Sequence, residues 1–132
     1  MTVPDEIRRS RYVSLTTYRR DGSGVATPVW HVLGDDGELL VITEARSWKV
    51  KRIRRNDQVL VAVCDVRGRV EPGTPSHRGT ARLLDERETE AGRRLLARRY
   101  VLSRVGNALS RLLRLRRPPM IGIAVRLTGA TG

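Results

Sequence analysis

Residues 11–33 read RYVSLTTYRRDGSGVATPVWHVL, and this stretch decides the fold class. Arg11 to Tyr18 is rich in β-branched and aromatic residues that alternate along the chain, which is typical of a strand. Asp21-Gly22 is a hairpin turn signal. Gly24 to Leu33 then predicts the return strand. The sequence therefore opens on an antiparallel β-hairpin.

The pattern continues outward from this hairpin. A turn at 34–37 precedes a third strand at 38–43, so we expect the first three strands to form an antiparallel meander. Apolar spacing and turn residues predict the remaining elements. These are a helix at 4–9, a helix at 47–55, a strand at 58–64, a loop at 65–76, a strand at 77–84, an interrupted helical segment at 85–117 and a last strand at 120–128.

Six short strands with a mid-chain helix and a late helical segment favour a mainly β fold. A closed or half-closed antiparallel barrel removes exposed strand edges, so we expect one six-stranded split β-barrel. An open α+β sheet with its helices on one face is the alternative. The length of 132 residues suits one domain, and no linker divides residues 1–132.

The amino-acid composition indicates the kind of partner and the cellular compartment to expect. The formal net charge of +12 favours an anionic partner, although a well-solvated basic surface has the same composition. Only Lys49 and Lys51 are lysines among the 26 basic residues; the others are arginines. No apolar run reaches the length of a membrane span. Cys64 is the single cysteine and cannot form an internal disulfide, so we expect a cytoplasmic protein.

The segment TEARSWKVK, residues 43–51, is the strongest candidate binding site. It leaves a strand with hydroxyls at Thr43 and Ser47 and starts a helix that carries Lys49 and Lys51. The first N–H groups of a helix and its positive end suit a phosphate, and charged side chains add strong hydrogen bonds. A solvated basic helix face is the alternative interpretation.

A second candidate is Thr27-Pro28-Val29-Trp30. Proline cannot donate to a β-ladder, so this strand is expected to have an edge or a break there. Backbone groups freed in this way can face a ligand, and Trp30 can pack on a planar ring. An edge strand with a core tryptophan explains the same residues equally well.

The usual catalytic signatures are missing from the sequence. His31 and His77 belong to no metal-binding motif, so no metal site is expected. Neither a GxSxG elbow nor a phosphate-binding P-loop is present. A low aromatic content of 4% and the lack of an RNA-binding signature argue against specific nucleic-acid binding by the basic late helices. If the protein is an enzyme, a cofactor is expected to carry the chemistry.

Three stretches together resemble a known family: RYVSLTTYRRDGSGVATPVW (11–30), ELLVITEARSWKVKRIRRNDQVLVAVCDVRGR (38–69) and GTARLLD (79–85). They resemble the pyridoxamine-5′-phosphate-oxidase-like split β-barrel flavoproteins, and within these the actinobacterial branch that uses the deazaflavin coenzyme F420. Trp48 stands where FMN oxidases of the wider family often carry arginine, which fits the deazaflavin branch.

The resemblance implies a homodimer with two cofactor sites at the subunit interface, and an F420-dependent oxidoreductase whose substrate the sequence does not reveal. FMN is the alternative cofactor, and a non-catalytic F420 or flavin carrier is the alternative function. By position, the resemblance assigns the cofactor phosphate to Thr43, Ser47, Lys49 and Lys51. It assigns the ring to Thr27, Pro28, Val29 and Trp30, and the phosphate or an acidic tail to Arg54 or Arg55.

Overall fold

The computed structural model describes residues 3–34, 36–101 and 119–131. The helices are α1 (Asp5–Arg9), α2 (Trp48–Arg55) and α3 (Glu86–Val101). The strands are β1 (Tyr12–Tyr18), β2 (Gly24–Val29), β3 (Val32–Leu33), β4 (Leu39–Glu44), β5 (Gln58–Cys64), β6 (Ser76–Leu83) and β7 (Met120–Thr131). The helices predicted at 4–9 and 47–55 are confirmed to within one residue. Part of the segment predicted at 85–117 lies outside the described residues.

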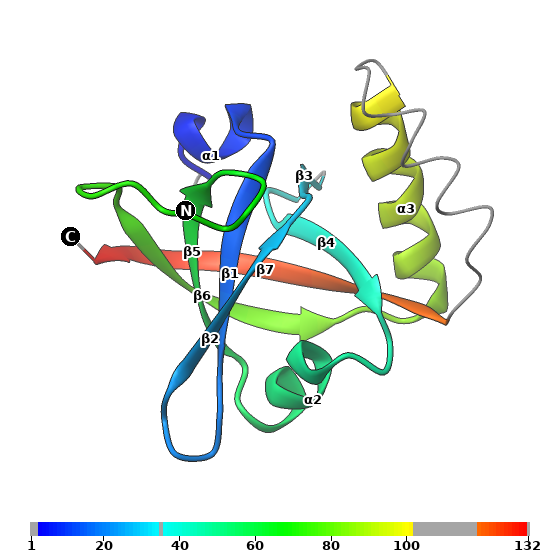
Figure 1. Cartoon of the computed structure of the whole chain (residues 1–132). Coiled ribbons are helices and arrows are strands. Elements are labelled where there is room, and N and C mark those ends of the chain that lie inside the picture. Colours follow the sequence, from blue (N-terminus) through cyan, green and yellow to red (C-terminus); the bar gives the residue numbers. More distant parts are fainter. Residues whose placement is uncertain (1–2, 35, 102–118, 132) are drawn as a thin grey trace.

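The seven strands form one sheet in the order β2-β1-β5-β6-β7-β4-β3, with antiparallel neighbours. β2 and β3 stand at opposite ends of this order, yet only Trp30 and His31 separate them in the chain. Consecutive Cα atoms are about 3.8 Å apart, so the two ends of the sheet lie within about 11 Å of each other. The sheet therefore curves round on itself (Figure 1). The predicted mainly β split barrel is confirmed.

The predicted meander is interrupted within its second strand, since β2 pairs with β1 and β3 pairs with β4, but β2 does not pair with β4. In the sheet, β2 has β1 as its neighbour, and β4 lies between β7 and β3. The predicted strand at 24–33 breaks at Trp30 and His31, which gives seven strands in place of six. His31 is fully buried and its Nε2 lies 2.7 Å from the carbonyl oxygen of Ile7. This inward turn carries the chain from one end of the sheet to the other.

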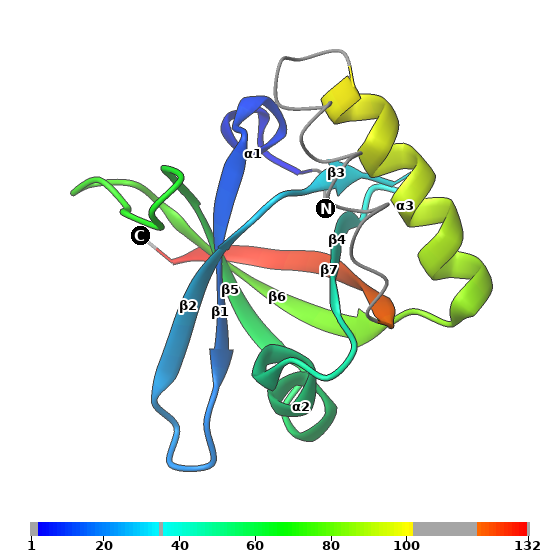
Figure 2. The ribbon, with the colours of Figure 1, turned by 45° about the vertical axis from the view of Figure 1, so that its right-hand side comes forward.

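Aliphatic side chains fill the barrel. Inward residues of β1, β4, β5, β6 and β7 form one buried cluster, which is closed by Ile7 from α1 and Ile53 from α2. The two helices lie at opposite ends of the barrel (Figures 1 and 2). Gly79 sits at a bulge in β6, where a Cβ would come within 2.8 Å of Val125. A side chain there would force β6 away from β7.

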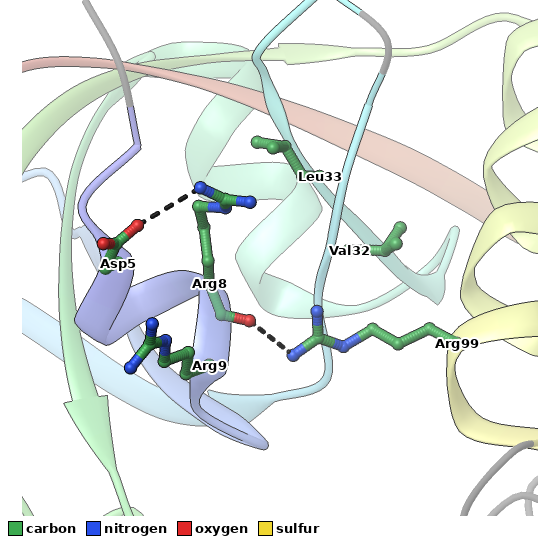
Figure 3. Close-up of a pocket in the computed structure, with 6 residues that line it drawn as sticks. All are labelled: Asp5, Arg8, Arg9, Val32, Leu33 and Arg99. Carbon is green, nitrogen blue, oxygen red and sulfur yellow. Dashed lines mark hydrogen bonds and ion pairs between the residues drawn. The ribbon is translucent and has the colours of Figure 1, made fainter.

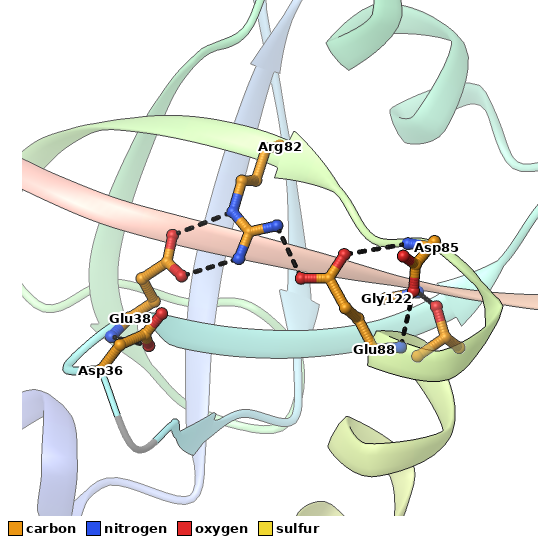
Figure 4. A network of polar contacts seen from close by, with 7 residues as sticks. Asp36, Glu38, Arg82, Asp85, Glu88 and Gly122 are labelled. Carbon is orange, nitrogen blue, oxygen red and sulfur yellow. Dashed lines mark hydrogen bonds and ion pairs between the residues drawn. The ribbon is translucent and has the colours of Figure 1, made fainter.

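α3 packs outside the barrel, where Leu96 contacts Trp30, Val32 and Ile42 (Figure 2). An ion-pair network holds the start of α3 to the sheet (Figure 4). Arg82 on β6 donates to both oxygens of the buried Glu38, at 3.0 and 3.3 Å, and to Glu88 at 2.9 Å. These carboxylates raise the pKa of Arg82 further above its already high value. In addition, the Asp85 carboxylate accepts from the backbone N–H of Glu88, which caps α3.

The end of the barrel near α1 is fastened by side chains from distant elements. Arg99 of α3 donates to the carbonyl oxygens of Arg8 at 2.9 Å and Ser10 at 2.7 Å (Figure 3). His77 on β6 lies 3.3 Å from Glu6. Arg99 and His31 thus bond to carbonyl groups at the end of α1, which a short helix leaves without helical partners, while His77 contacts a side-chain carboxylate of the helix.

His31 makes the fold sensitive to acid. Burial lowers its pKa from 6.5 to about 4; the hydrogen bond to Ile7 opposes this and the positive charge of Arg99 adds to it. The neutral ring is therefore favoured in the folded state, so the stabilisation is complete above pH 6.5 and is lost as the pH falls toward 4.

Between pH 7 and about 4, we expect the free energy of unfolding to fall by about 3 kcal/mol less in His31→Gln than in the wild type. Glutamine can still donate to Ile7 but does not titrate. Urea unfolding of both proteins at pH values from 7 down to about 4 measures the difference, and the carboxylates common to both cancel. Parallel curves over this range would contradict this role of His31.

Candidate functional site

The candidate site is the corner where β4 ends and α2 begins. Lys49 Nζ donates to Thr43 Oγ1 at 3.4 Å, so the first turn of α2 is joined to the last residues of β4. Ser47 occupies the N-cap position of α2 with an extended backbone, but its side chain makes no capping hydrogen bond. We call Thr43, Ser47 and Lys49 the β4–α2 corner. The structure therefore brings together three of the predicted phosphate ligands.

Lys49 carries the positive charge of this corner. Burial lowers the pKa of Lys49, and the positive charge of Arg52 acts in the same direction, while Glu44 opposes both. Among the described residues, Lys49 forms no ion pair. A half-buried ammonium group in this position would be stabilised by a bound anion.

In the part of the chain that the structure describes, two buried hydroxyl oxygens have no hydrogen-bond partner: Ser47 Oγ and Thr27 Oγ1. Buried polar atoms in folded proteins nearly always have a partner, so each such atom calls for an explanation. Ser47 lies in the β4–α2 corner, and Thr27 lies in β2 opposite Leu15 of β1. Both belong to the predicted cofactor site, and a bound ligand would supply the missing partner.

The other predicted ring-binding residues lie on β2 and just after it. Pro28 is exposed, and a Cβ on Gly68 would come within 3.2 Å of its Cδ, so the loop at 65–75 lies against this strand. Trp30 packs on the α3 side, in the Leu96 cluster and 6.3 Å from the Tyr12 ring. None of the described contacts joins Thr27 to Trp30 with the β4–α2 corner.

The remaining predicted residues occupy other faces of α2. Lys51 Nζ lies 4.4 Å from the centre of the Trp48 ring. Arg55 donates to the carbonyl oxygen of Tyr18 at 2.9 Å, and Arg54 is exposed. The two lysines, adjacent in the sequence pattern, therefore have different surroundings, and only Lys49 contacts the corner.

A neighbouring basic cleft was not predicted. It has a volume of about 450 Å³ and lies between α2 and the β1–β2 hairpin; its lining residues are Arg19, Arg20, Trp48, Arg52 and Arg55. We call it the arginine cleft. Trp48, Arg52 and Arg55 recur at helical spacing, so the sequence could have shown that these three side chains share one face of a helix. The sequence does not show that the hairpin arginines face the same cleft, because this depends on the tertiary fold.

The family model for pyridoxamine 5′-phosphate oxidase matches residues 2–117, nearly the whole chain. The chain belongs to the pyridoxamine 5′-phosphate oxidase family. No curated protein sequence matches it.

Solved structures share the fold of this family member. The conserved hypothetical protein Rv2991 from Mycobacterium tuberculosis superposes with a TM-score of 0.71 at 21% identity, covering 96% of this chain and 78% of that one. A protein described as F420 reductase has a TM-score of 0.65 at 21% identity, covering 98% of both chains. A FAD-binding protein from Mesorhizobium loti has a TM-score of 0.64 at 16% identity, covering 94% of this chain and 84% of that one.

No helix among the described residues is both long enough and apolar enough to cross a membrane.

Ser47→Ala tests whether the unpartnered hydroxyl serves the fold. Replacing a serine that caps a helix usually costs about 1 kcal/mol of stability. Here the hydroxyl makes no capping bond, so we expect the variant without ligand to be as stable as the wild type, or slightly more stable. Thermal unfolding measures this. A loss of about 1 kcal/mol or more would show that Ser47 is a structural cap.

Proposed function

We propose that this chain is an F420-dependent oxidoreductase that transfers a hydride between the deazaflavin and a small organic substrate. The observation that carries the proposal is the charge at the start of α2. α1 and α3 have acidic residues in their first turns, as the helix dipole favours, whereas α2 has none and carries Lys49 there. A cation at the positive end of a helix is unfavourable unless an anion binds beside it.

The residues present fit a phosphate group. Lys49 supplies a charged donor, and the hydroxyls of Thr43 and Ser47 lie in the same corner. These three residues would hold the phosphate, with Lys51, Arg54 and Arg55 adding positive potential from the rest of α2. The nearly full-length structural match to a protein described as F420 reductase also supports the choice of cofactor.

The ring of the cofactor would lie along β2. The unpartnered Thr27 Oγ1 offers a hydrogen bond, and Pro28 leaves a position without an N–H donor in the strand. Val29 and Trp30 complete this predicted wall. When bound, F420 supplies the hydride-transferring carbon, and the protein supplies binding and orientation.

A homodimer is part of the proposal. The loop against β2 exposes two apolar side chains, Val66 and Val70, at 63% and 41% of their surface. A second copy covering this loop and the edge of β2 would shield the ring from water. The site is then completed at the subunit interface.

A non-catalytic carrier of F420 or of a flavin is the second candidate. Both histidines contact α1, at the opposite end of the barrel from α2: His31 contacts the Ile7 carbonyl and His77 contacts Glu6. The ordinary imidazole proton donors are thus engaged away from the β4–α2 corner. Binding without proton transfer is consistent with this placement.

Lys49→Met should weaken F420 binding about 10- to 100-fold, because a charge-assisted hydrogen bond to the phosphate is lost while the apolar stem is retained. Lys51→Met is the matched control, because it removes the same charge from the exposed ammonium over Trp48. A larger loss of affinity in Lys49→Met than in Lys51→Met is then due to the half-buried Lys49 ammonium. Fluorescence titration with F420 measures both variants. Wild-type affinity in Lys49→Met would remove the phosphate assignment.

Parallel titrations with F420 and FMN test the choice of cofactor. We expect F420 to bind at micromolar concentration and FMN to compete poorly. Equal or tighter FMN binding would favour an FMN-dependent oxidase or reductase of the same fold. Oxidation of reduced F420 in the presence of enone, quinone or tetrapyrrole acceptors then separates an enzyme, which turns over at least one of them, from a carrier.

A further inference from the structure

The arginine cleft carries more positive charge than the proposed cofactor phosphate explains. Arg19 and Arg20 reach it from the β1–β2 hairpin, and Arg52 and Arg55 reach it from α2. The hairpin and α2 lie at the same end of the barrel (Figures 1 and 2). No acidic residue lines the cleft, and none of the ion pairs between described residues includes a residue of its wall.

Two of these guanidinium groups are held in place. Arg52 Nε donates to Thr17 Oγ1 at 2.8 Å, and Arg55 donates to the Tyr18 carbonyl oxygen at 2.9 Å. Burial lowers the pKa of Arg52, and the like charges of Arg19 and Arg55 lower it further. Fixed cations that repel one another form a preorganised anion site, because a bound anion removes the repulsion. Arginine also presents a planar fork that matches phosphate oxygens.

Trp48 adds an aromatic surface to the same cleft. Its side chain is 70% exposed, although it is one of only two tryptophans in the chain. The Lys51 ammonium covers one face of its ring at 4.4 Å. At about 100° per residue, Trp48, Arg52 and Arg55 point within about 60° of one another, toward the cleft. The ring therefore borders the guanidinium groups and can offer its other face to a planar ligand.

We propose that the arginine cleft is a binding site for a nucleoside diphosphate, with the base stacked on Trp48 and the phosphates held by Arg19 and Arg52. The volume of about 450 Å³ lies in the range of small-molecule sites. Proteins that bind single-stranded nucleic acid stack successive bases on several aromatic side chains, whereas this cleft has one in its wall. A single nucleotide matches the cleft better than a polynucleotide.

This site is distinct from the proposed cofactor phosphate seat. Lys49 contacts Thr43 and does not line the arginine cleft. Arg55 is the one residue assigned to both sites. Since the nucleotide site is argued from Arg19, Arg52 and Trp48, the two proposals can fail separately.

Calorimetric titration of the full chain with ADP, pyrophosphate and adenosine, at about 0.15 M salt, tests the proposal. We expect ADP to bind about tenfold more tightly than pyrophosphate, since only ADP can stack, and adenosine to show no measurable binding. Trp48→Ala should weaken ADP binding about tenfold and leave pyrophosphate unchanged. Arg52→Gln should weaken both phosphate ligands about tenfold or more.

Arg87→Gln is the matched control, because it removes one exposed guanidinium from α3, outside the cleft. If Arg87→Gln weakened the binding of ADP and pyrophosphate as much as Arg52→Gln does, net charge alone would explain the effect and the proposed site would be overturned. Equal wild-type affinity for ADP and pyrophosphate would overturn stacking on Trp48. A loss of ADP binding in Lys49→Met as large as in Arg52→Gln would move ADP to the β4–α2 corner. Tighter binding of a thymidine oligonucleotide than of ADP, lost in Arg52→Gln, would mean that the cleft binds nucleic acid instead.

Discussion

The fold depends on a covalent constraint: two residues, Trp30 and His31, join the strands at opposite ends of the sheet order. So short a connection leaves the sheet no option but to curve until its ends meet. β3 has only two paired residues, both with β4, and is not hydrogen-bonded to β2. The covalent link through Trp30 and His31, with the contacts of these two residues, thus closes the barrel. The barrel stays split because β2 and β3 are not hydrogen-bonded to each other.

This closure gives the two ends of the barrel different properties. At the α1 end, His31, His77 and Arg99 bond to polar groups of the chain itself. At the α2 end, Ser47 Oγ has no partner among the described residues, and no acidic residue lines the arginine cleft. The asymmetry follows from where the polar groups find partners, and it is one reason why we propose that ligands bind at α2.

Local pattern was sufficient for most elements but not for their arrangement. The Asp21-Gly22 turn, the alternation in 12–18 and the apolar pair Val50 and Ile53 are encoded within a few residues, and the corresponding hairpin and helix formed as predicted. The break after Val29 was missed because Trp30 and His31 are apolar or neutral in a strand-like run, and the sequence does not show that Trp30 packs on Leu96 while His31 turns inward onto the Ile7 carbonyl. The arginine cleft was missed for the same reason, since the sequence does not show that the hairpin arginines face α2.

α2 shows how little of its charge the fold requires. This eight-residue helix is anchored by Val50 and Ile53, its two buried residues, and carries five cationic side chains on its remaining positions. Isolated helices of this length are unstable in water, so tertiary packing of the two apolar residues must maintain it. The cations repel one another, and burial opposes the charge on Lys49 and Arg52. Arg52, Arg54 and Arg55 stand in the last turn, where the helix dipole favours cations. Lys49 stands in the first turn, where the dipole opposes its charge, and the apolar pair already anchors the helix. We therefore propose that the charge on Lys49 serves a bound anion and not the fold.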